Sequence, residues 1–188
     1  MIILQEATAL QEFLRKKRRE GLHIGFVPTM GALHNGHLAL LQQARDAGNY
    51  TVVSIFVNPT QFNDPKDFEK YPVTLEEDIR MLEENGCHLL FLPSVGEIYP
   101  NGYHSGTSYH LGELEKIWEG YYRPGHFQGV CQVVDRLLNL AEPDFLYMGL
   151  KDYQQCMVIK KLLSIRRDAG AIQLVLCATL READGGNE

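Results

Sequence analysis

Short apolar runs alternate along the chain with segments whose apolar residues recur at helical spacing. The runs rich in β-branched residues predict five strands, at 23–27, 51–57, 88–92, 145–148 and 172–178. Helices are predicted between them, at 8–20, 36–47, 74–85, 130–138 and 153–165. Because each strand is a near-continuous apolar run, both faces of the sheet should be covered. The pattern therefore predicts a doubly wound (Rossmann-like) α/β fold, with a parallel sheet of about five strands and helices on both faces.

Helix-end signals refine two of these helices. Thr8 with Gln11, and Thr74 with Glu77, have the spacing of a capping box, and an Asn-Gly pair at 85–86 ends the helix that Thr74 begins. The segment 94–125 has scattered glycine and tyrosine and no clear period. It predicts a small irregular insertion with a short hairpin and an active-site loop.

Composition narrows the class of protein. The 188 residues suit one domain, and 45% hydrophobic residues exclude disorder as the main state. The formal charge of −6 argues against a nucleic-acid surface, which needs clustered cations. No run is long enough for a membrane span, the N-terminus lacks a signal-peptide pattern, and the four cysteines form no paired motif. The expectation is a soluble cytoplasmic protein without nucleic-acid or membrane partners.

The segment that follows the first predicted strand reads Pro-Thr-Met-Gly-Ala-Leu-His-Asn-Gly-His, at 28–37. His34 and His37 flank Gly36 where a helix begins, and free N–H groups at a helix N-terminus suit phosphate. The same pair of imidazoles is compatible with a metal site or with a structural role. Taken alone, the pattern leaves these three interpretations open.

Polar residues also follow other predicted strands, where an open α/β sheet binds its ligands. Asn58 and Gln61 offer neutral amides suited to a small hydroxy acid, and Arg123 lies in a glycine-flanked loop where its planar guanidinium would clamp phosphate. A turn residue, a solvated glutamine and a surface arginine are the plainer alternatives.

The last candidates surround the helix predicted from residue 153. Lys151 follows Gly149 after a strand, Asp152 is placed to cap the helix, and Gln155 lies one turn on. A lysine there would offset charge that grows on phosphates in a transition state, although a plain strand-end charge is the alternative. Glu77 and Asp78, in an acidic first helical turn, are weak candidates for Mg²⁺ ligands.

Four sequence blocks occur together in this chain. They are Thr-Met-Gly-Ala-Leu-His-Asn-Gly-His at 29–37, Phe-Val-Asn-Pro-Thr-Gln-Phe at 56–62, Arg-Pro-Gly-His-Phe-Gln-Gly-Val at 123–130, and Gly-Leu-Lys-Asp-Tyr-Gln-Gln at 149–155. Their identity and order resemble the nucleotidylyltransferase superfamily and, within it, the pantothenate synthetase family. The resemblance extends from Leu22 to Gly185.

The resemblance implies an ATP-dependent ligase that joins pantoate to β-alanine. Pantoate attacks the α-phosphorus of ATP to give pantoyl adenylate and pyrophosphate, and the amine of β-alanine then displaces AMP. The residues that would contact ATP are Met30, Gly31, His34, His37, Arg123, Gly149, Lys151 and Asp152, with His34, His37 and Lys151 as the catalytic set. Gln61, Gln155 and Asn58 would hold pantoate. Mg²⁺ and a homodimer are further implications.

The chain departs from the family's pattern after 181–185. Family members continue into a Ser-Ser-Arg-Asn segment and a smaller C-terminal lid domain, so residues 1–188 are expected to form an N-terminal nucleotide- and pantoate-binding domain with impaired turnover. Two alternatives stay open. One is a related nucleotidylyltransferase acting on a phosphopantetheine or nicotinamide mononucleotide, which the block at 56–62 disfavours. The other is a non-catalytic nucleotide-binding or dimerisation module.

Overall fold

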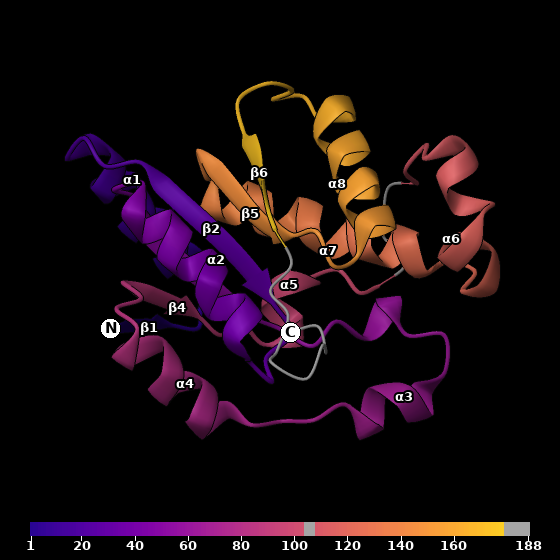
Figure 1. Cartoon of the computed structure of the whole chain (residues 1–188), viewed down its shortest axis with the longest axis horizontal. Coiled ribbons are helices and arrows are strands. Elements are labelled where there is room, and N and C mark those ends of the chain that lie inside the picture. The colour runs from indigo at the N-terminus through magenta and orange to yellow at the C-terminus, as the bar shows by residue number, and fades with distance from the viewer. Residues whose placement is uncertain (104–107, 179–188) are drawn as a thin grey trace.

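A computed structural model of the chain describes residues 1–103 and 108–178. Its core is a six-stranded parallel sheet in the order β1-β4-β3-β2-β5-β6 (Figure 1). The strands are β1 (Ile2–Leu4), β2 (Ile24–Thr29), β3 (Tyr50–Ile55), β4 (Leu89–Phe91), β5 (Phe145–Gly149) and β6 (Gln173–Cys177). The helices that cover it are α1 (Ala7–Arg19), α2 (Asn35–Asp46), α4 (Leu75–Glu84), α7 (His126–Ala141) and α8 (Tyr153–Ile165). The predicted doubly wound α/β class is confirmed.

Alternation along the strands explains why helices lie on both faces. Phe26 packs into a core with α1, α7 and α8, whereas the next residue, Val27, packs into a second core with α2 and α4. Val52 and Val53 divide between the two cores in the same way. Successive side chains of a strand point to opposite faces, so an uninterrupted apolar run fills both.

The sheet has one strand more than predicted. β1 is only three residues long and pairs with β4 in the register Ile2–Leu89 to Leu4–Phe91. Ile2 and Ile3 stay more than 40% exposed at this edge. Such a short run carries no periodic signal, and only its pairing with β4 makes it a strand.

The two predicted capping boxes do not form. α1 begins at Ala7 after Glu6, and the backbone N–H of Ala7 donates to the Glu97 carboxylate at 2.8 Å. Thr74 does precede α4, but its hydroxyl donates to the side chain of Asp78 and caps no backbone group. Asn85 ends α4 as predicted, with Gly86 at φ 76°.

The predicted insertion is helical where the structure describes it. Residues 94–103 and 108–125 hold α5 (Val95–Ile98), the 3₁₀ turn η2 (Gly112–Glu115) and α6 (Trp118–Tyr122), and no hairpin strand occurs within them. Two short elements follow β3, the 3₁₀ turn η1 (Pro59–Gln61) and α3 (Pro65–Lys70). The family block at 181–185 lies outside the described residues.

Strand order locates the site. The chain runs outward from β2 to β3 and β4 on one side, and β5 and β6 lie on the other, so the order reverses between β2 and β5. Ligands of open α/β sheets bind outside the carboxyl ends of the strands at such a switch point. The segments that follow β2, β3 and β5 carry most of the residues singled out by sequence, whereas Arg123 follows α6 and Glu77 and Asp78 lie in α4.

Candidate active site

Two adjoining cavities open at the carboxyl edge of the sheet. The amide cavity, of about 270 Å³, is lined by Asn58, Gln61 and Gln155 together with apolar side chains of α7. The imidazole cavity, of about 730 Å³, is lined by a polar set: His34, His37, Glu119, Arg123, His126, Lys151 and Asp152. Met30, His37 and Gly149 border both cavities. The fold thus collects every residue predicted to contact ATP or pantoate around one divided site.

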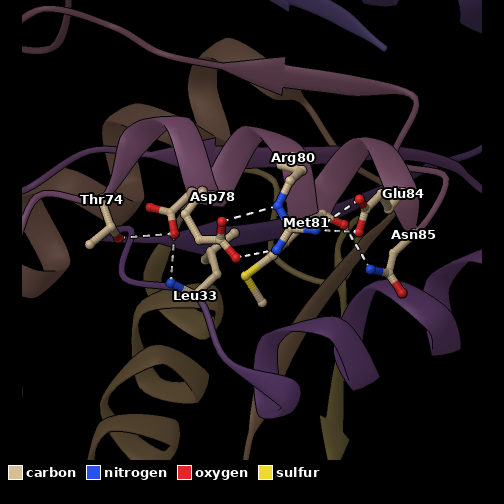
Figure 2. A network of polar contacts seen from close by, with 8 residues as sticks. Leu33, Thr74, Asp78, Arg80, Met81, Glu84 and Asn85 are labelled. Atoms are coloured by element: carbon tan, nitrogen blue, oxygen red, sulfur yellow. Dashed lines mark hydrogen bonds and ion pairs between the residues drawn. The ribbon is translucent and has the colours of Figure 1, made fainter.

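The loop after β2 is held in a conformation that side chains normally avoid. Gly31 has φ 80° and Ala32 has φ 51°, both in the left-handed region. The carboxylate of Asp78, on α4, accepts hydrogen bonds from the backbone N–H groups of Ala32 and Leu33, each at 3.0 Å. Figure 2 shows the bond from Leu33. Asp78 is only 2% exposed. A buried carboxylate from another helix therefore fixes the loop that leads into α2.

The hydrogen bonds of Asp78 also show whether the predicted Mg²⁺ ligands, Glu77 and Asp78, are available to bind a metal. One oxygen of Asp78 accepts from Ala32, and the other accepts from Leu33 and from the Thr74 hydroxyl. Glu77 is exposed and pairs with Arg80. Arg80 also bonds Glu84 (Figure 2). No group of three or more His, Cys, Asp or Glu side chains suited to a metal occurs among the described residues. Glu77 and Asp78 do not fit a Mg²⁺ site in this arrangement.

The two histidines of the block at 29–37 cap α2 with their side chains. Nδ1 of His34 accepts from the backbone N–H of Gly36 at 3.1 Å, and Nδ1 of His37 accepts from the backbone N–H of His34 at 3.2 Å. Because a backbone N–H only donates, each Nδ1 must be unprotonated, and the hydrogen-bond network assigns the ring proton of each neutral imidazole to Nε2. The ring centroids lie 4.1 Å apart. The cap thus makes both imidazoles Nε2–H donors.

Burial, the neighbouring His34 and Lys151 lower the pKa of His37 to about 4, although Asp78 opposes the shift. Between pH 6.5 and 4 the unfolded chain binds a proton at His37 that the folded chain does not. Folding stability should therefore fall as the pH drops through this window, by up to about 3 kcal/mol for this group. Urea unfolding at pH 7 and pH 4.5 measures the loss, and His37→Asn should show a smaller difference. Equal differences in the two proteins would contradict the assignment.

Asn58 organises the turn after β3. Its side chain is buried, its amide nitrogen donates to the Gly129 carbonyl at 3.1 Å and to Gln61 Oε1 at 3.2 Å, and its oxygen accepts from Thr60 and Tyr99. These bonds use both of its N–H donors. Asn58 therefore orients Gln61, whose oxygen is engaged and whose own amide nitrogen is left to donate to a ligand.

The turn lies directly against α7. A Cβ built on Gly129 would lie 2.5 Å from the carbonyl oxygen of Thr60, closer than side chains approach backbone. Glycine at 129 is therefore required for η1 and α7 to meet. This contact joins the block at 56–62 to the block at 123–130.

His126, the first residue of α7, is a site residue that sequence reasoning missed. It is 4% exposed, borders the imidazole cavity, and its Nδ1 lies 2.8 Å from the carbonyl oxygen of Gln61. The block at 123–130 contains it, but its sequence position does not reveal contact with a residue 65 positions away. Burial lowers the pKa of His126 below its usual value.

The loop after β5 completes the site. Asp152 caps α8 as predicted, accepting from the backbone N–H of Gln155 at 3.0 Å. Gln155 lines the amide cavity, and Lys151 lines the imidazole cavity. The adjacent Gln154, which the sequence did not single out, is buried and bonds the backbone of Leu114, Ile117 and Glu119. It fastens the insertion to α8.

Fold and site together define the class: an α/β domain with a nucleotidylyltransferase-like fold, whose divided cavity lies at the switch point of the sheet. The family model described as pantoate-beta-alanine ligase matches residues 2–186. The chain belongs to this family.

Relatives of known name agree with this assignment. Pantothenate synthetase of Aquifex aeolicus is 45% identical over 184 residues, and that of Rubrobacter xylanophilus is 46% identical over 188. These alignments cover 98% and 97% of this chain but 64% of each relative, so the chain spans about two thirds of their length.

Solved structures have the same fold. Pantoate-beta-alanine ligase from Francisella tularensis, complexed with beta-gamma ATP and beta-alanine, superimposes with a TM-score of 0.92 at 41% identity. The match covers 100% of this chain and 70% of that one. Pantothenate synthetase from Thermus thermophilus gives a TM-score of 0.86 at 43% identity, covering 100% of this chain and 65% of that one.

Proposed function

We propose that this chain forms the nucleotide- and pantoate-binding part of an ATP-dependent ligase that condenses pantoate with β-alanine. In the first half-reaction, the pantoate carboxylate attacks the α-phosphorus of ATP, giving pantoyl adenylate and releasing pyrophosphate. In the second, the amine of β-alanine displaces AMP to give pantothenate. Family membership and the likeness to the Francisella tularensis ligase support this proposal.

The main observation behind this proposal is that the site consists of two adjoining cavities with different chemistry. One cavity is mostly apolar with convergent amides, which suits a branched hydroxy acid, and the other offers imidazoles, an ammonium and a guanidinium, which suit phosphates. His37 borders both, at the place where a carboxylate from one cavity would meet a phosphate from the other.

Each predicted residue has a part in this scheme. The Nε2–H groups of His34 and His37, with Lys151, would stabilise charge that grows on the phosphates, and Arg123 would clamp a phosphate. Met30, Gly31, Gly149 and Asp152 would border the nucleotide, while Gln61 and Gln155 would bind pantoate. A carboxylate is already charged at pH 7, so alignment and charge compensation suffice for the first half-reaction.

Other parts of the proposal, such as Mg²⁺ and the cytoplasmic location, have fewer observations behind them. Mg²⁺ would arrive with the phosphates of ATP. Four buried free cysteines suit a reducing compartment, which supports a cytoplasmic location. The homodimer, the lid domain and the reduced turnover of residues 1–188 without it stay predictions.

Isotope exchange tests the function directly. We expect the chain to exchange labelled pyrophosphate into ATP when pantoate is present and not when it is absent. Exchange that needs a different acid or nucleotide would instead support a related nucleotidylyltransferase. Calorimetric binding of ATP without any exchange would leave a nucleotide-binding module.

Gln61→Ala tests the pantoate subsite. It removes one neutral hydrogen bond to the ligand, so the Kd for pantoate should rise about three- to tenfold. Isothermal titration calorimetry measures the change, and the Kd for ATP should stay the same. Gln43→Ala, at an exposed position on α2, is the control. An unchanged Kd for pantoate in Gln61→Ala would remove this glutamine from the subsite.

A further inference from the structure

His126 has a hydrogen-bond chemistry unlike that of the other two imidazoles in its cavity. A carbonyl oxygen only accepts, so the contact between Nδ1 and the Gln61 carbonyl places the ring proton on Nδ1. The neutral ring then carries its lone pair on Nε2. His34 and His37 are the opposite, because their Nδ1 atoms accept and their Nε2 atoms carry the proton.

The lone pair of His126 faces open space. Nε2 has no hydrogen-bond partner among the described residues, and the buried, unpartnered side-chain atoms found there are Ser54 Oγ and Arg136 Nε. Nε2 is therefore accessible, although the residue as a whole is 4% exposed. Since His126 borders the imidazole cavity, that access leads into the cavity.

A hydrogen-bond acceptor at Nε2 of His126 distinguishes an amine from a phosphate. A lone pair repels phosphate oxygens and attracts an N–H donor. Three charged groups act on His126: the carboxylates of Asp152 and Glu119, and the guanidinium of Arg123. Arg123 has the largest of these three effects on the ring and favours its neutral form, in which Nε2 accepts a hydrogen bond.

We propose that Nε2 of His126 accepts the amine of the second substrate, orients it and takes its proton during amide formation. The inference rests on the proposed function and extends it to the second half-reaction. His126 bonds the main chain of Gln61, which lines the amide cavity, and itself borders the imidazole cavity. It therefore connects the turn that carries Gln61 to the wall of the imidazole cavity, which the proposed function assigns to the phosphates.

The step balances without any further reactant. The neutral amine donates one N–H to Nε2, which leaves its nitrogen lone pair directed at the acyl carbon. As the C–N bond forms, that proton passes to Nε2. The C–O bond to the phosphate then breaks, AMP leaves with the electron pair on its phosphate oxygen, and the imidazolium returns its proton to solvent.

Two substitutions test the roles of Nδ1 and Nε2 of His126 separately. In His126→Asn, the amide nitrogen occupies the place of Nδ1 and keeps the bond to Gln61, while the acceptor at Nε2 is lost. We expect pantoate-dependent pyrophosphate exchange within about threefold of wild type, but β-alanine-dependent consumption of pre-formed adenylate about 100-fold slower, as for loss of a general base. His126→Gln, with an amide near Nε2, should orient the amine but not take its proton, and should fall between the two proteins.

Controls and spectroscopy make the outcome decisive. His110→Asn, at an exposed position away from both cavities, should change neither half-reaction. A long-range ¹H–¹⁵N spectrum of the wild-type chain, assigned with the variants, should show His126 as the Nδ1–H tautomer and His37 as Nε2–H. A proton on Nε2 of His126, or equal effects of His126→Asn on both half-reactions, would overturn the inference. Wild-type protein without exchange would instead overturn the proposed function and this inference with it.

Discussion

His37→Asn is expected to slow adenylate formation several hundredfold, equivalent to about 3 to 4 kcal/mol of transition-state stabilisation. The side-chain oxygen of asparagine can occupy the place of Nδ1 and accept from the N–H of His34, so the cap of α2 is preserved. The substitution removes the Nε2–H group of a side chain that lines both cavities. Pyrophosphate exchange measures the rate, and thermal melting verifies that the variant folds.

Two comparisons test whether His37 donates a hydrogen bond to phosphate or has only a structural role. His37→Gln places an amide near Nε2 and should recover part of the rate while weakening the cap. Lys151→Ala, which removes the ammonium from the same cavity, should also slow exchange several hundredfold. A loss of less than threefold in both His37→Asn and Lys151→Ala would mean that the phosphates bind elsewhere.

Asp78→Ala is expected to lower the free energy of unfolding by about 3 to 4 kcal/mol. The substitution leaves the N–H groups of Ala32 and Leu33 without their acceptor, at about 1 to 3 kcal/mol for each buried group. It also releases Ala32 from its left-handed conformation, so the loop before His34 should relax and exchange should slow. Urea unfolding gives the stability change.

Two further variants test whether the hydrogen bonds from Ala32 and Leu33 to Asp78 account for this loss of stability. Asp78→Asn keeps the shape but turns an N–H₂ toward one of the two backbone donors, so it should be destabilised to a similar extent. Glu77→Gln, one residue earlier and exposed, should unfold at nearly the same urea concentration as wild type. Asp78→Ala with wild-type stability would show that the loop holds its conformation without this carboxylate.

The sequence was informative wherever a signal is local. Period and β-branching revealed the central strands β2, β3 and β5, and Asp152 at the head of α8 behaved as its residue type predicts. β1 and the insertion were less predictable, since three residues carry no period and the turns of 112–122 are fixed by partners such as Gln154. The capping boxes failed because the groups concerned have other partners: Glu97, distant in sequence, accepts from the first N–H of α1, and Asp78, four residues on, accepts from the hydroxyl of Thr74.

The candidate site, like the fold, was predictable from the sequence where its signals are local. Residue types and block order identified the family and most of the charged, imidazole and amide side chains that line the site, because chemistry at a strand end is carried by a few polar side chains on short loops. The use of Asp78 as an anchor, the protonated nitrogen of His126 and the bond that holds Asn58 to Gly129 were decided by contacts between segments far apart in the chain. The caps made by His34 and His37 are local, but the sequence pattern did not reveal them.

The amino-acid order alone determined a parallel α/β domain and the kinds of groups at its carboxyl edge, since both follow from local periodicity and composition. Only the folded chain decided which of those groups donate, which accept and which are already engaged. Hydrogen-bond direction depends on the partner atom, and for Asp78, Asn58 and His126 that atom belongs to another element of the fold.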